Sequence, residues 1–118
     1  MLEASLERGS VVHKASLILM DNAVLALFYE GSMKIGTLAV STSGLREGST
    51  GTSSVLLGGK YLIAARALAE KVAASFSKMG IVSLNTQLTE GEALRVYSSL
   101  LDKVRSGPMG PPEAGSRG

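Results

Sequence analysis

The stretch VVHKASLILMDNAVLALFYEGSMKIGTLAV, residues 11–40, decides the fold. It holds three runs rich in Val, Leu, Ile and Ala, at 11–20, 23–30 and 33–40, which are separated only by Asp21-Asn22 and Gly31-Ser32. The residue types in these two breaks tolerate the positive φ angles that two-residue hairpin turns require. The sequence therefore predicts three antiparallel strands that follow one another as a meander.

The two turns also sort the side chains of these strands by face. Pairing Met20 with Ala23 and Glu30 with Met33 fixes which side chains stand next to each other. One face would carry Leu17, Leu19, Val24, Ala26, Phe28, Met33, Ile35 and Ala39. The other would carry Ile18, Met20, Leu25, Leu27, Leu38 and Val40, with Lys14, Ser16, Tyr29 and Lys34 at its margins. Because both faces are apolar at their centres, we expect both to be covered.

The remaining segments extend the pattern on both sides. Residues 2–8 alternate with period two and predict a strand, residues 41–54 have little to bury and predict a long loop, and 55–57 and 81–84 predict short strands. A helix is predicted over 60–79 and ended by Gly80, with its apolar stripe at Tyr61, Ala65, Leu68, Val72, Phe76 and Met79. Thr89 and Glu92 form a capping box before a second helix, whose stripe is Ala93, Val96, Tyr97, Leu100, Leu101 and Val104.

These elements predict an α+β fold, an antiparallel sheet with two helices on one face. Two helices cannot cover both faces of the sheet, so we expect the second face to stack on another copy or a paralogue, giving an α-β-β-α sandwich. The predicted interface consists of Ile18, Met20, Leu25, Leu27, Leu38 and Val40. We expect one domain over residues 1–105, followed by a disordered Gly- and Pro-rich tail at 106–118.

Composition narrows the classes of function. The chain has 118 residues, 45% hydrophobic and 19% charged, as expected for one folded domain. It has no cysteine and one histidine, which excludes disulfides, thiolate chemistry and sites built on two imidazoles. Its net charge of +2 is dispersed and aromatic residues are only 4%, which disfavours nucleic-acid binding. No run approaches the ~20 apolar residues of a membrane span and the first residues start no signal peptide, so we expect a soluble cytoplasmic protein.

Few residues are candidates for chemistry. Gly58-Gly59-Lys60 at a helix start is similar to a phosphate loop, but Ser54 and Tyr61 stand where that motif needs Gly and Ser or Thr, so we predict a plain strand-to-helix turn. His13 has no motif partner, and we predict a surface or edge histidine. We therefore expect no catalytic residues, no metal and no cofactor. The segment Leu45, Arg46 and Glu47 is the candidate partner-binding loop, although an unconstrained connector explains it equally well.

Four segments carry a resemblance to a known family. They are 33–38 (MKIGTL), 54–58 (SVLLG), 67–71 (ALAEK) and 82–88 (VSLNTQL). In their order and spacing they resemble the small proteasome assembly chaperones, the third and fourth members of the eukaryotic set and their archaeal relatives. The resemblance implies a non-enzymatic, dimeric chaperone that binds proteasome α-subunits while their ring assembles. A dimeric α/β scaffold for another complex and a small anion- or nucleotide-binding protein remain as alternatives.

Overall fold

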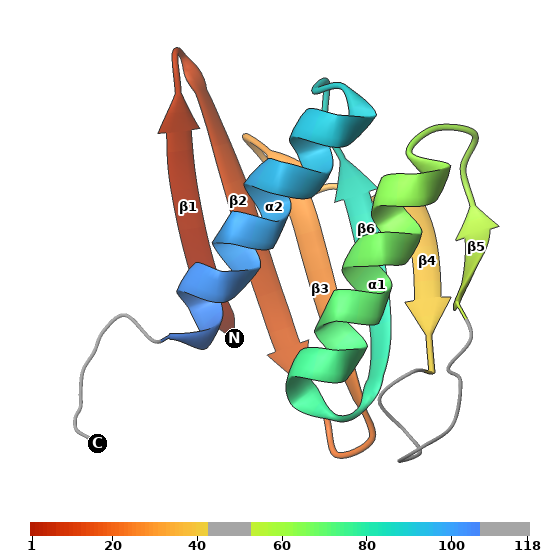
Figure 1. Ribbon diagram of the computed structural model, residues 1–118. Coiled ribbons are helices and arrows are strands. Elements are labelled where there is room, and N and C mark those ends of the chain that lie inside the picture. Colours follow the sequence, from red (N-terminus) through yellow and green to blue (C-terminus); the bar gives the residue numbers. More distant parts are fainter. Residues whose placement is uncertain (43–52, 107–118) are drawn as a thin grey trace.

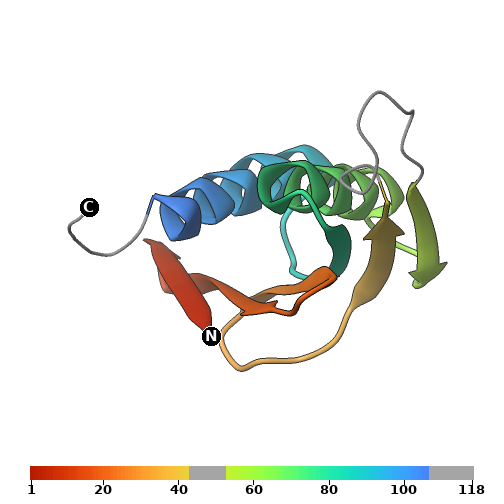
Figure 2. The ribbon, with the colours of Figure 1, turned by 90° about the horizontal axis from the view of Figure 1, so that it is seen from below.

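The computed structural model describes residues 1–42 and 53–106, which form one six-stranded sheet with two helices packed on it (Figure 1). In chain order the elements are β1 (Leu2–Arg8), β2 (Val11–Leu19), β3 (Ala23–Glu30), β4 (Thr37–Ser41), β5 (Ser53–Leu57), α1 (Leu62–Phe76), β6 (Met79–Asn85) and α2 (Glu90–Arg105). Both helices lie on the same face of the sheet (Figure 2). The predicted α+β class is confirmed.

The order of the strands across the sheet is β1-β2-β3-β6-β4-β5. The register of the hairpin of β2 and β3 is as predicted, and the Met20 amide donates a hydrogen bond of 2.8 Å to the Ala23 carbonyl. Asp21 and Asn22, however, make the turn without the positive φ angles that the prediction assumed. The predicted pairing of β3 with the next strand, with Glu30 opposite Met33, is wrong. Strand β6 lies between β3 and β4, parallel to the first and antiparallel to the second. The sheet is therefore mixed, not antiparallel.

Residues 31–36, which we call the strap, make this arrangement possible. Because β3 and β4 are two strand spacings apart, about 10 Å, a two-residue turn cannot join them, whereas six residues can. The strap crosses β6, where the Gly36 amide donates to Ser83 Oγ at 2.9 Å and Asn85 Nδ2 donates to the Ile35 carbonyl at 3.0 Å. A Cβ atom on Gly36 would overlap the Leu84 carbonyl, so the close crossing requires glycine. Strand β4 consequently begins at Thr37, later than the sequence predicts.

The helices differ from the prediction only at their ends. Helix α1 ends at Phe76 because Ser77 takes the left-handed conformation (φ 55°) and donates its amide to the Ala73 carbonyl. Gly80, predicted to end the helix, instead lies within β6. The capping box of α2 is confirmed, since the Thr89 side chain accepts the Glu92 amide at 3.3 Å. The whole predicted stripe of α2 is buried, namely Ala93, Val96, Tyr97, Leu100, Leu101 and Val104.

The core lies between the helices and one face of the sheet. Of the side chains assigned to this face, five are fully buried there: Leu17, Val24, Ala26, Phe28 and Ala39. Leu19, at the end of β2, is 47% exposed. Met33 and Ile35 were assigned to this face wrongly, because they belong to the exposed strap.

Part of the predicted long loop and of the predicted tail cannot be compared with the structure. Residues 43–52 and 107–118 lie outside the described residues. Ser53 and Ser54, which we placed in the loop, belong to β5 and pair with Ser41 and Val40 of β4.

Candidate functional site

The face of the sheet away from the helices, which we call the open face, carries partly exposed aliphatic side chains from several strands. Because residues directly opposite on paired strands share a face, the register defines rows across the sheet. One row consists of Ile18, Leu25, Ile81 and Val40, from β2, β3, β6 and β4. The next row consists of Ser16, Leu27, Ser83, Leu38 and Leu57, and it reaches β5.

The six residues predicted as an interface retain different amounts of exposure on this face. Ile18 is 37% exposed, and Met20, just beyond β2, is 40% exposed. Leu25, Leu38 and Val40 are half-buried. Leu27 is 8% exposed and therefore largely shielded within the chain itself. The structure thus brings residues of three separate segments onto one surface.

Ile81 and Leu57 are two members of this surface that sequence reasoning missed. Both were recognised as strand residues, but neither was assigned to a face because the sequence does not say which strands they neighbour. Ile81 lies between Leu25 and Val40 at the centre of the first row. Leu57 ends the second row and is 59% exposed. The other predicted site, Leu45, Arg46 and Glu47, lies outside the described residues.

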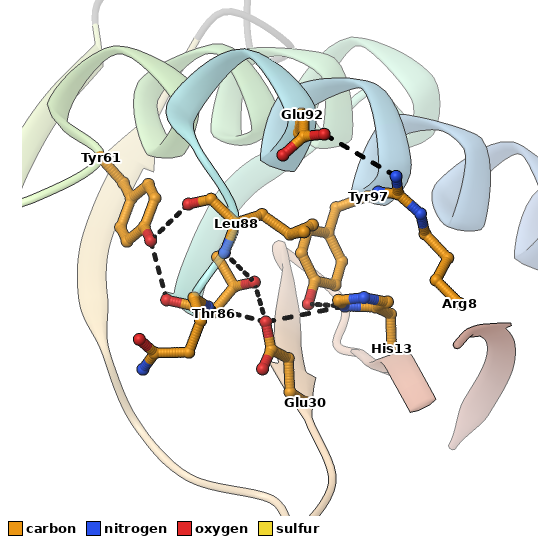
Figure 3. Close-up of polar contacts among 9 residues, drawn as sticks. Arg8, His13, Glu30, Tyr61, Thr86, Leu88, Glu92 and Tyr97 are labelled. Carbon is orange, nitrogen blue, oxygen red and sulfur yellow. Dashed lines mark hydrogen bonds and ion pairs between the residues drawn. The ribbon is translucent and has the colours of Figure 1, made fainter. Parts of the chain in front are cut away.

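A second feature, which we call the polar cluster, lies on the helix side at one end of the sheet (Figure 3). It consists of His13, Glu30, Tyr61, Thr86 and Tyr97, drawn from three strands or strand ends and both helices. His13 Nδ1 lies 2.8 Å from the Tyr97 hydroxyl and 3.9 Å from Glu30 Oε2. The Tyr61 hydroxyl is directed at the carbonyls of Thr86 and Leu88, at 2.8 and 2.6 Å.

Glu30 connects this cluster to the loop between β6 and α2. Its Oε2 accepts hydrogen bonds from the Thr86 hydroxyl and, at 2.7 Å, from the Gln87 amide. Thr86 Oγ1 in turn accepts the Leu88 amide at 3.2 Å. The loop is therefore held by Glu30 from β3 and by Tyr61 from the start of α1, and these contacts position the start of α2.

The prediction that His13 is a surface or edge histidine is wrong, because its side chain is only 1% exposed. Its position opposite Leu6 and its strand alternation place it on the helix face, where Tyr97 packs against it edge-on at 5.5 Å between ring centroids. Burial lowers the pKa of His13, and the Arg8 charge lowers it further, whereas the carboxylate of Glu30 opposes the shift. The histidine acts as a packed, hydrogen-bonded part of the core.

The other titratable groups of the cluster are shifted in ways that keep its hydrogen bonds intact near neutral pH. Burial raises the pKa of Tyr97 to about 12, and the negative charge of Glu30 adds to the effect. Burial, Glu30 and Glu90 raise the pKa of Tyr61. Burial also favours the neutral form of Glu30, but the hydrogen bonds from Thr86 and Gln87 outweigh it and the pKa of Glu30 is lowered.

The first turn of α1 is the third candidate, since free amides at a helix start bind anions. Here Glu90 Oε2 accepts the amides of Ile63 and Ala64, at 2.6 and 2.8 Å. The chain's own carboxylate thus occupies the position that a phosphate oxygen would take. Gly58, at φ 118°, packs against Thr37 so closely that a Cβ would lie 2.6 Å from its Oγ1, so this strand-to-helix turn requires glycine at that position.

Neither a metal site nor a membrane span is found in the part of the chain that the structure describes. No three His, Cys, Asp or Glu side chains of residues 1–42 and 53–106 gather in a group that could hold a metal ion. Among the same residues, neither helix is both long enough and apolar enough to cross a membrane.

No protein-family model matches the chain. The curated proteins give no match either.

Proposed function

We propose that this chain is a non-catalytic, cytoplasmic chaperone that assists assembly of the proteasome α-ring by binding α-subunits. It acts as a dimer, with itself or with a paralogue. The observation that carries the proposal is the open face, where four strands present partly exposed aliphatic side chains at their centre. The resemblance of segments 33–38, 54–58, 67–71 and 82–88 to the small assembly chaperones supplies the identity of the client.

The energetics of this surface support dimerisation. Burying apolar surface gains about 25 cal/mol per Å², and fully covering one exposed Leu or Ile gains about 1.5–3 kcal/mol. Ile18, Met20 and Leu57, with the half-buried Leu25, Leu38, Val40 and Ile81, would together contribute several kcal/mol per copy toward the cost of association. Two open faces stacked about 10 Å apart would leave both helix layers outside.

In this proposal the dimer presents a preformed surface that holds α-subunits in register and then releases them. The segment Leu45, Arg46 and Glu47 is the proposed contact with the α-subunit. Standard-size interfaces of about 800 Å² per partner span a wide range of affinities, so binding modest enough for release is compatible with specific recognition.

The alternatives make different predictions for the same sample. A dimeric scaffold for another complex would form the same dimer but would not bind α-subunits. An anion- or nucleotide-binding protein using the start of α1 would have to displace Glu90 from the Ile63 and Ala64 amides. That occupied position favours the chaperone over the anion-binding protein.

The test combines solution mass with α-subunit binding. We expect sedimentation to give a dimer at micromolar concentration and the dimer to co-migrate with its cognate α-subunits. Ile18→Asp, on the open face, should give a folded monomer. Leu19→Asp is the matched control, because Leu19 is the adjacent residue, is similarly exposed and lies on the opposite face. Absence of co-migration at micromolar concentration would refute the proposed function.

A further inference from the structure

The strap is a ridge on the open face. It passes beneath the sheet on the side away from the helices (Figure 2). It is held to β6 by Ser83 and Asn85, which bond its Gly36 amide and its Ile35 carbonyl. Its side chains Met33 and Ile35 are 48% and 57% exposed, and Lys34 between them is exposed. The half of the open face over β6 and β4 therefore carries a protruding, partly apolar segment.

The other half of the same face carries a hollow. It has a volume of about 370 Å³ and is lined by Glu3 and Ser5 of β1, Lys14 and Ser16 of β2, and Tyr29 of β3. Ser16 and Tyr29 form its floor: their hydroxyls are 2.9 Å apart, and the two residues are 1% and 5% exposed. At about 30 Å³ per water molecule, the hollow has room for more than one side chain.

The strap and the hollow lie at the same level along the strands. The register places Ser5, Lys14, Tyr29 and Asn85 in one row across β1, β2, β3 and β6. Ser5, Lys14 and Tyr29 line the hollow, and Asn85 holds the strap. The ridge and the hollow therefore lie at the same level along the strands, and they are displaced from each other in the direction across the strands.

We propose that two copies of this chain pair through their open faces about a two-fold axis parallel to the strands, so that the strap of each copy enters the hollow of the other. This inference rests on the proposed function, of which the dimer is a part. An axis parallel to the strands exchanges the two halves of the face and preserves the level along the strands. In such an isologous pairing every contact occurs twice. An axis across the strands would instead place β1 on β1 and leave both hollows empty.

The charges on the open face favour the same pairing. Alternation places Glu3 and Glu7 of β1 on this face, beside the hollow, and Lys14 of β2 lies among them. The strap carries Lys34 and no acidic side chain. Exchange of the halves brings Lys34 of each copy toward the acidic β1 of the other, which selects this orientation over one that places β1 on β1.

Because the chain contains no cysteine, introduced cysteines report this pairing directly. The Ser5→Cys/Met33→Cys variant should form a covalent dimer under mild oxidation, since disulfides require Cα atoms within about 7 Å. The control is Ser5→Cys/Leu19→Cys, because Leu19 is 47% exposed, as Met33 is 48% exposed, but lies on the helix face. We expect the Ser5→Cys/Met33→Cys variant to form the covalent dimer at least tenfold faster than the Ser5→Cys/Leu19→Cys control, as measured by non-reducing gel electrophoresis.

The outcomes separate this inference from the proposed function. If the unmodified protein sediments as a dimer but the Met33 pair links no faster than the Leu19 pair, the pairing is overturned and the dimer stands. If the protein is a monomer at high micromolar concentration, the dimer and the pairing both fail. As a second readout, Lys34→Glu should weaken the dimer severalfold and added Glu3→Lys should recover it. If Lys34→Glu and Glu3→Lys each weaken the dimer and the double variant is weakened by the sum of the two effects, the pairing is contradicted.

Discussion

The hydroxyl of Tyr97 offers a quantitative test of the polar cluster. Tyr97 is fully buried, and its hydroxyl lies 2.8 Å from Nδ1 of His13, which is 1% exposed. Tyr97→Phe keeps the ring contacts with Phe28 and His13 but leaves the imidazole nitrogen without its partner. Leaving one buried polar group unpaired costs about 1–3 kcal/mol. We therefore expect the variant to be less stable by this amount at pH 7.

The stability cost of the same substitution should disappear in alkali. The pKa of Tyr97 is raised from 10.0 to about 12, so the folded protein keeps this proton where the unfolded chain loses it. The corresponding stability is complete below pH 10 and is lost as the pH rises to about 12. At about 1.4 kcal/mol per pKa unit, the loss is about 3 kcal/mol. The variant has no hydroxyl to ionise, so its deficit at pH 7 should shrink toward zero at pH 12.

Urea denaturation followed by circular dichroism at pH 7, 9, 10.5 and 12 measures both effects. Tyr29→Phe serves as the control, because Tyr29 is 5% exposed and bonds Ser16 at 2.9 Å, outside the polar cluster. A Tyr97→Phe deficit that is the same at pH 7 and pH 12 would show that the hydroxyl is not held in the buried environment described here.

Three further predictions concern stability. Gly36→Ala should cost about 1–3 kcal/mol in urea denaturation because its Cβ collides with the backbone of β6, whereas Gly59→Ala, with open space around the Cβ, should cost less than half as much. Glu90→Ala should cost about 0.5–2 kcal/mol, as loss of a helix cap does, and an unchanged urea midpoint would show that the Ile63 amide does not depend on it. The lowered pKa of His13 means that the unfolded chain takes up this proton first, so stability is complete above pH 6.5 and falls as the pH decreases below it. His13→Gln should flatten thermal stability between pH 6.5 and 5, and a slope equal to that of the unmodified protein would contradict this reasoning.

Elements whose signals are local could be predicted from the sequence. The period-two run at 2–8 became β1, and the apolar runs at 11–20 and 23–30 became β2 and β3. The hairpin at Asp21-Asn22 formed in the predicted register. The capping box at Thr89 starts α2, and the helical spacing from Ala93 onward faces the core. In each case the residues that carry the signal lie within a few positions of one another, so the backbone conformation and the buried side follow from the chain alone.

The candidate site could be predicted only in part, because some of its residues are brought together only by pairing between strands that are distant in the sequence. Ile18 and Leu25 pair within the hairpin, so their shared face follows from one turn. Leu38 and Val40 lie on that face through β6, which the sequence does not place beside them. Alternation keeps these two residues on one face whichever strand lies next to β4, but only the pairing with β6 makes it the face of Ile18 and Leu25.

The amino-acid sequence by itself determined the strands, the helices, the turn at 21–22 and the apolar character of both sheet faces, because these depend on side chains close together in the chain. Only the tertiary structure decided that β6 lies between β3 and β4, that residues 31–36 cross it as a strap, and that His13 meets Tyr97 84 positions away. Gly31-Ser32 can begin either a tight turn or a longer crossing. The choice depends on the free energy of packing β6 and α1 into the sheet, which is summed over contacts between distant segments.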